Sequence, residues 1–124
     1  MLSLFIRKPA TPMLFFVNAH VGRGSNSDMP AKLAGAYVSV YVFANDPESA
    51  LREAFSQVTR RGYEFLELSD GKVHQMDPQE WDVYVKTAWP EFPSHFPAQS
   101  AVLATFAPGW VFFGPFAGYE SQRA

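Results

Sequence analysis

Residues 36–49, Ala-Tyr-Val-Ser-Val-Tyr-Val-Phe-Ala-Asn-Asp-Pro-Glu-Ser, decide the fold of this chain. Within it, Val38, Val40 and Val42 alternate with Tyr37, Ser39, Tyr41 and Phe43, which is the period of a strand with two distinct faces. Directly after it, Asp46 suits a helix N-cap and Pro47 suits the first helical position. The stretch therefore predicts a strand over 36–44 that leads straight into a helix.

The helix is expected over residues 47–61. Its apolar residues recur at helical spacing, at Leu51, Ala54, Phe55 and Val58. Gly62 follows and is placed to end the helix in the left-handed conformation. We expect the valines of the preceding strand to face this helix.

Toward the N-terminus, residues 13–21 are rich in β-forming side chains and predict a further strand. A loop over 22–35 is expected from its Gly, Ser, Asn, Asp and Pro residues. Residues 1–12 are predicted to be a flexible extension that precedes a single domain over 13–118. Residues 119–124 are predicted to be a frayed tail.

Toward the C-terminus, the pattern predicts a hairpin followed by a second helix. Residues 63–68 and 72–76 read as strands joined by a tight turn at Asp70-Gly71. Asp77-Pro78 begins a helix that Trp89-Pro90 ends. After an irregular proline-rich segment, residues 101–106 and 110–113 read as a hairpin, with Pro115 and Gly118 ending the pairing.

This order of elements predicts an α+β fold of the ferredoxin-like type. From residue 36 it reads βαββαβ, a two-layer sandwich in which two helices pack on one face of a mainly antiparallel sheet. An extra N-terminal strand and a C-terminal hairpin are added to that core. Fold alone does not carry function.

Composition and charge limit the partners and cofactors that we expect. The 12 acidic and 10 basic residues are scattered, so we expect no nucleic-acid partner. No apolar run is long enough to span a bilayer, so no membrane partner is expected. The sequence holds no cysteine and no paired histidine motif, so we expect no metal site and no cofactor. A cytoplasmic location is the expectation.

The sheet face away from the helices is predicted to be apolar too. If the valines face the helices, Tyr37, Tyr41 and Phe43 point to the other side. An exposed apolar face usually marks a contact surface, so we expect a homodimer whose interface includes these residues together with Trp89 and Phe92. The alternative is that the proline-rich segment or residues 110–113 cover this face within one chain.

Polar groups interrupt the same face and form the candidate ligand site. The residues concerned are Phe16, Asn18, His20, Arg23, Tyr37, Ser39 and Tyr41. Apolar walls with a few polar groups are typical of small-ligand pockets. His20 either acts as a general base or only caps a strand end, and Arg23 either clamps an anion or belongs to a surface loop.

Two functions follow from these patterns. The first is an interaction or regulatory module, without enzymatic activity, that binds itself and another protein. The alternative is a small-molecule sensor or enzyme with a pocket on the aromatic face at the dimer interface.

Overall fold

The computed structural model describes residues 13–120, so the predicted extension over 1–12 and the last four residues of the predicted tail lie outside the described residues. Its elements are β1 (Met13–Gly22), β2 (Leu33–Ala44), α1 (Pro47–Arg60), β3 (Glu64–Met76), the 3-10 helix η2 (Pro78–Glu80), α2 (Trp81–Ala88), α3 (Gln99–Ala104) and β4 (Val111–Glu120).

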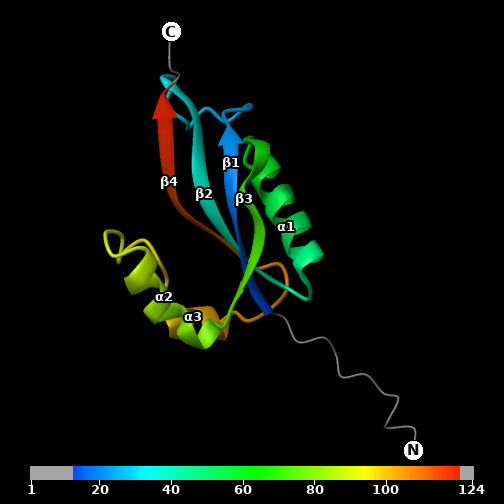
Figure 1. The fold of residues 1–124 in the computed structure, drawn as a ribbon, viewed down its shortest axis with the longest axis vertical. Helices are drawn as coiled ribbons and strands as arrows, with labels where there is room; N and C mark the ends of the chain where they lie inside the picture. Colours follow the sequence, from blue (N-terminus) through cyan, green and yellow to red (C-terminus); the bar gives the residue numbers. More distant parts are fainter. Residues whose placement is uncertain (1–12, 121–124) are drawn as a thin grey trace, which may run out of the picture.

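The four strands form one antiparallel sheet in the order β3-β1-β2-β4 (Figure 1). α1 carries the chain from β2 past β1 to β3, as a crossover connection must. The predicted α+β class is confirmed. The finer prediction of a ferredoxin-like core is wrong, because the order of elements is ββαβαβ, with α2 and α3 together in the second helical position.

The first reason for this difference lies in β3. Asp70-Gly71, which the sequence predicted as a hairpin turn, is a bulge within one long strand that pairs with β1 on both sides of it. The pairs Val17↔Val73 and Ala19↔Leu68 are two residues apart on β1 and five apart on β3. Gly71 has φ +67°, the left-handed conformation that this bulge requires and that glycine adopts without strain.

The second reason is that residues 99–104 form α3 and not a strand. Short apolar runs do not distinguish helix from strand by period alone. Here Asp82 and Gln99 exchange bonds: each side chain accepts from the other's backbone N–H, both at 3.0 Å. This pair fixes the start of α3 beside α2, and Val102 is then buried under the sheet.

β4 is longer than predicted, because Pro115 and Gly118 do not end its pairing. The strand runs to Glu120, and Tyr119 pairs with Gly35 of β2. Pro115 is tolerated because β4 is an outer strand with a register shift at this point. The predicted tail therefore begins inside a strand.

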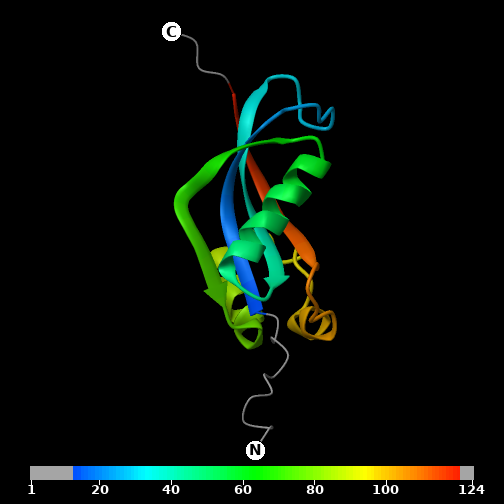
Figure 2. The ribbon, with the colours of Figure 1, turned by 90° about the vertical axis from the view of Figure 1, so that its right-hand side faces the viewer.

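α1 packs on one face of the sheet, as Figure 2 shows with the helix in front of the strands. Its predicted start is confirmed: the Asp46 carboxylate accepts the Ser49 backbone N–H at 2.7 Å, and that bond lowers the pKa of Asp46. Gly62 follows the helix with φ +86°. The buried core between helix and sheet is formed by Phe15, Val17, Ala19, Val21, Ala36, Val38, Val40, Val42, Ala50, Ala54 and Val58.

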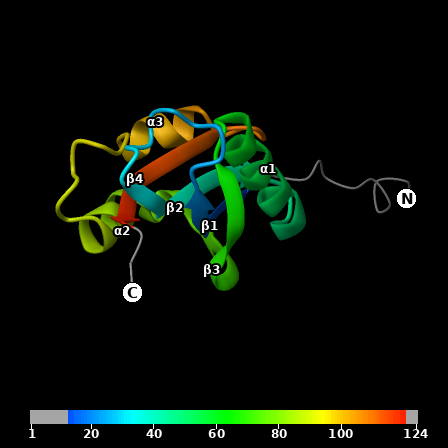
Figure 3. The ribbon, with the colours of Figure 1, turned by 90° about the horizontal axis from the view of Figure 1, so that it is seen from above.

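The sheet face away from α1, called here the second face, is covered only at one end. Seen from above, α1 and α2 lie on opposite sides of the strands (Figure 3). α2, α3 and the segment between them pack over the covered end, around the fully buried Trp81. The second face is thus apolar at this end, as predicted, and it is covered by the same chain. Its core residues are Leu14, Tyr41, Phe43, Trp81, Val85, Phe96 and Val102.

This cover changes the predicted interface. Tyr41 and Phe43 are buried within the chain, so their side chains are not available for contact with a partner. Tyr37 and Phe92 are exposed, and Trp89 is half-buried. Dimer formation itself stays a prediction, restricted to these exposed residues.

Candidate functional site

The open end of the second face is organised around one polar pair. Asn18 of β1 lies opposite Ser39 of β2 in the register of the central strands. Ser39 is the one buried polar residue among residues 13–120. Its hydroxyl donates to Asn18 Oδ1 at 2.7 Å. The pair sits where the apolar pattern of both strands is interrupted.

Both outer strands are distorted at the level of this pair. The bulge in β3 lies between the partners of Val17 and Ala19, which flank Asn18. The register shift in β4 lies between the partners of Val38 and Val40, which flank Ser39. Bulges commonly re-aim side chains beside functional sites. The sheet is therefore reshaped from both sides at one level.

Asp70 ties the β3 bulge to the central strands. Its Oδ2 accepts from Asn18 Nδ2 at 2.9 Å and from His74 Nε2 at 2.6 Å, and its Oδ1 accepts the Lys72 N–H at 3.1 Å. The bond from His74, followed by that from Asn18, lowers the pKa of Asp70 to about 2. Asp70 is therefore a carboxylate over the physiological pH range.

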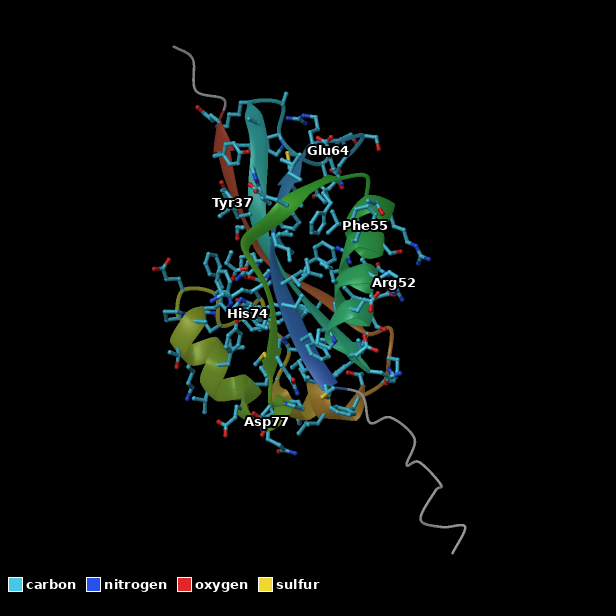
Figure 4. All side chains as sticks on the ribbon, turned by 45° about the vertical axis from the view of Figure 1, so that its right-hand side comes forward. Tyr37, Arg52, Phe55, Glu64, His74 and Asp77 are labelled. Carbon is cyan, nitrogen blue, oxygen red and sulfur yellow. The ribbon has the colours of Figure 1, made fainter. Side chains whose placement is uncertain are left out.

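A pocket of about 290 Å³ opens over the polar pair. We call it the sheet pocket. The bulges supply Ser69 on one side and Pro115 on the other, and Trp89 stands at the boundary with the covered end. The full lining consists of Asn18, Tyr37, Val38, Ser39, Ser69, Trp89, Pro115 and Ala117. Figure 4 shows Tyr37 and His74 on this side of the sheet and Arg52 and Phe55 on the α1 side.

His20 lies beside the sheet pocket and is held on three sides. Its Nδ1 is 3.1 Å from Glu67 Oε2, and its Nε2 is 2.5 Å from the Tyr119 hydroxyl. Its ring stacks on Tyr37 with the centroids 4.6 Å apart. Because both nitrogens are occupied, His20 positions Tyr37 and Tyr119 in this structure and offers no free lone pair to a ligand.

Phe16 and Tyr41 belong to the covered end. The Tyr41 hydroxyl is 2.6 Å from that of Tyr84 and accepts the Trp89 indole N–H at 2.9 Å. Burial, then the bond to Tyr84, raises the pKa of Tyr41. Phe16 packs against His74 and Tyr41. Tyr41 thus holds Trp89 at the edge of the sheet pocket, and neither Phe16 nor Tyr41 lines the pocket.

Arg23 is placed apart from the other predicted site residues. Its guanidinium donates to the backbone carbonyls of Met29 and Pro30, in the loop that joins β1 to β2, and of Leu33, the first residue of β2. The same loop is fixed to the end of α1 by the Ser25 N–H, which donates to the Gly62 carbonyl at 2.8 Å. Arg23 thus shapes a loop.

A second hollow lies between α2 and the proline-rich segment. This proline groove has a volume of about 470 Å³. It is lined by Asp82, Val85, Lys86, Trp89, Pro90, Pro93, Phe96, Pro97 and Ala98. Phe92 is exposed beside it and packs on Trp89 edge to face. The predicted interface residues Trp89 and Phe92 therefore meet at its rim.

Sequence reasoning missed the residues that the outer strands bring to the site, namely Ser69, Asp70, His74, Pro115 and Tyr119. The Asp70-Gly71 pair predicts a turn, which correctly indicates an interruption of the strand pairing at this point. Nothing local shows that this interruption lies opposite Asn18.

Within residues 13–120, no group of three His, Cys, Asp or Glu side chains is arranged to hold a metal ion. In the same range no helix has the length and apolar character needed to cross a membrane. Compared with known proteins, the chain matches no family model, no curated protein and no solved structure.

Proposed function

We propose that this domain is a small-molecule-binding module, of the sensor type, and that its ligand occupies the sheet pocket. The observation that carries the proposal is the coincidence of three features at one level: the Asn18–Ser39 pair and the two distortions of the outer strands. A few fixed polar groups among aromatic and apolar walls are what small-ligand sites contain.

The polar groups are held in place before any ligand arrives. Asn18 is bonded to Ser39 and Asp70, and Trp89 is bonded to Tyr41. Preorganised groups favour binding because less conformational entropy is lost on association. Both lining serines donate their hydroxyl hydrogens to oxygens of Asn18 and not to a base that could activate them as nucleophiles, which favours binding over catalysis.

The test is a screen of small fragments of mixed charge against the ¹⁵N-labelled protein by NMR. We expect hits to shift the backbone amides of residues 18, 37–39, 69 and 117. Ser69→Ala should weaken the binding of these fragments, because it removes a hydroxyl from the pocket lining. It should leave the core intact, because Ser69 is exposed. Ser56→Ala on α1 is the matched control. Shifts that avoid the pocket, or hits that Ser69→Ala leaves unchanged, would refute the proposal.

A second candidate function, favoured by the proline groove, is an interaction module for another protein. Aromatic and proline side chains with a charged rim, here Asp82 and Lys86, resemble the surfaces that bind extended apolar peptides. Proline-rich peptides added to the same labelled protein would then shift Lys86 and the Trp89 indole N–H, and Phe92→Ser would weaken them. Peptides that shift neither signal would count against this function.

A further inference from the structure

The two serine hydroxyls of the sheet pocket, Ser39 and Ser69, can only accept hydrogen bonds from a ligand. Asp70 is a carboxylate, so the Asn18 amide nitrogen must be the atom that faces it. Asn18 Oδ1 then faces Ser39, whose hydroxyl hydrogen it receives. The Ser69 hydroxyl donates its hydrogen to the backbone carbonyl oxygen of Asn18 at 3.2 Å. Both hydroxyls therefore keep only their lone pairs for a ligand.

The charged group linked most directly to the lining is a carboxylate. None of the eight lining residues is a lysine or an arginine. Asp70 lies one hydrogen bond behind Asn18, and Glu67 lies earlier on the same strand. Lys72 follows on the bulge and Lys86 borders the proline groove, and neither lines the sheet pocket. An anionic ligand would therefore find no cation in the lining, whereas a cation would lie near the Asp70 carboxylate that holds Asn18.

Two aromatic rings complete the recognition surface. Tyr37 is 45% exposed although its ring is fixed by stacking on His20. Trp89 is held by its indole N–H bond to Tyr41. The faces of such rings attract cations within about 6 Å of the centroid. Acceptor oxygens, carboxylates and aromatic faces together favour a ligand that is both a hydrogen-bond donor and positively charged.

We propose that the sheet pocket binds the primary ammonium group of a small organic amine, with the hydroxyl oxygens of Ser39 and Ser69 accepting its N–H groups and Tyr37 and Trp89 packing on its apolar part. This inference rests on the proposed function and names the chemical class of its ligand.

The test compares four small probes that share a phenyl ring and differ in their polar group: benzylammonium, benzyl alcohol, benzoate and benzyltrimethylammonium. Each is titrated into the labelled protein at pH 7, and dissociation constants are taken from the pocket amides. We expect benzylammonium to bind roughly three- to thirtyfold more tightly than benzyl alcohol, the range of a cation–aromatic contact. Benzoate should be the weakest. Benzyltrimethylammonium should bind less tightly than benzylammonium, because it has no N–H to donate.

Three variants test whether the preference for benzylammonium over benzyl alcohol arises in the sheet pocket. Tyr37→Leu keeps an apolar side chain and should lower the preference for benzylammonium over benzyl alcohol severalfold. Asp70→Asn should do the same by removing the nearby carboxylate. Glu48→Gln removes an exposed carboxylate on α1, on the other face of the sheet, and should leave the preference unchanged. If Asp70→Asn does not fold, the Tyr37 variant and the probe series decide the question.

The results of these titrations distinguish failure of the ammonium inference from failure of the proposed small-molecule-binding function. Equal affinity for benzyl alcohol or benzoate at the pocket amides would overturn the ammonium class and leave the binding function standing. A preference that persists in Tyr37→Leu would also overturn it. If none of the four probes shifts the pocket amides, the ammonium inference fails, and the mixed-charge fragment screen judges the binding function separately.

Discussion

Asn18 connects three strands through one side chain and its own carbonyl. Its amide oxygen accepts from Ser39 of β2, its amide nitrogen donates to Asp70 of β3, and its backbone oxygen accepts from Ser69 of β3. A buried or half-buried amide is stable only when such partners are present. The residue therefore acts as the common fixed point for the polar floor and one wall of the sheet pocket.

Asp70 should make the stability of the domain depend on pH in the acid range. Its pKa is lowered from 3.8 to about 2 in the folded protein, so the folded state favours the carboxylate. The stabilisation is fully present above about pH 4 and is lost as the pH falls toward 2. Because the side chain is 33% exposed, we expect its size to be about 1 kcal/mol or less.

Urea unfolding at a series of pH values between 2 and 6 checks this expectation. Asp70→Asn should flatten the decline in unfolding free energy below pH 4, because the titrating group is gone. The control is Asp28→Asn, an exposed loop carboxylate remote from His74. An unchanged decline in Asp70→Asn would show that other groups cause it.

At the scale of elements, α1 and the central strands could be predicted because their signals are local. Asp46, Pro47 and the helical spacing of apolar residues mark α1 without reference to any other part of the chain. β3 could not be predicted as one strand. The turn tendency of Asp70-Gly71 is local, whereas its pairing with β1 is a long-range contact that overrides it.

The residues of the candidate site also divide into those that local sequence signals predict and those that only tertiary pairing brings together. Strand alternation places Tyr37 and Ser39 on one face of the predicted strand, Asn18 is a predicted ligand residue beside that face, and all three line the sheet pocket. Ser69 and Pro115 could not be added, because each reaches the pocket through a register shift that only tertiary pairing sets. Arg23, predicted as an anion clamp from its glycine-containing turn, instead donates to backbone carbonyls, in a loop that is fixed to the end of α1.

Trp81 should determine whether α2 and α3 stay on the sheet. It is fully buried, and its indole N–H donates to the Pro97 carbonyl at 2.8 Å. Trp81→Phe removes this donor and leaves a cavity, so we expect a loss of roughly 1–3 kcal/mol in the free energy of unfolding. Hydrogen exchange should quicken in α2 and α3 and remain slow in α1.

The control for this variant lies on the same helix. Val83 is 60% exposed, so Val83→Ala should change stability little. If Trp81→Phe instead speeds exchange equally in all three helices, the cover of the second face is not a separate unit, and its attachment does not depend mainly on Trp81.

At the scale of the whole molecule, the two faces of the sheet are covered unequally. α1 lies along one face, while α2 and α3 cover only one end of the other. The sheet pocket lies where that partial cover stops, at Trp89. The position of the sheet pocket therefore depends on how far α2 and the segment that follows it extend over the second face.

The predicted homodimer can be tested on this surface. If two chains associate through the residues left exposed, native mass spectrometry should give a two-chain mass, and Phe92→Ser should shift it toward one chain. Phe92 is 42% exposed, so this substitution does not disturb the core. A one-chain mass at every protein concentration would contradict the homodimer and leave the cover of the second face to the chain alone.

The two distortions beside Asn18 and Ser39 have a further consequence for solubility. β3 and β4 are the rims of an open sheet, and such rims expose unpaired backbone groups that can template the addition of foreign strands. Here each rim is broken near its middle, by the Asp70-Gly71 bulge on one side and by Pro115, which lacks an N–H, on the other. The same irregularities that shape the pocket thus protect the molecule against edge-to-edge polymerisation into fibrils.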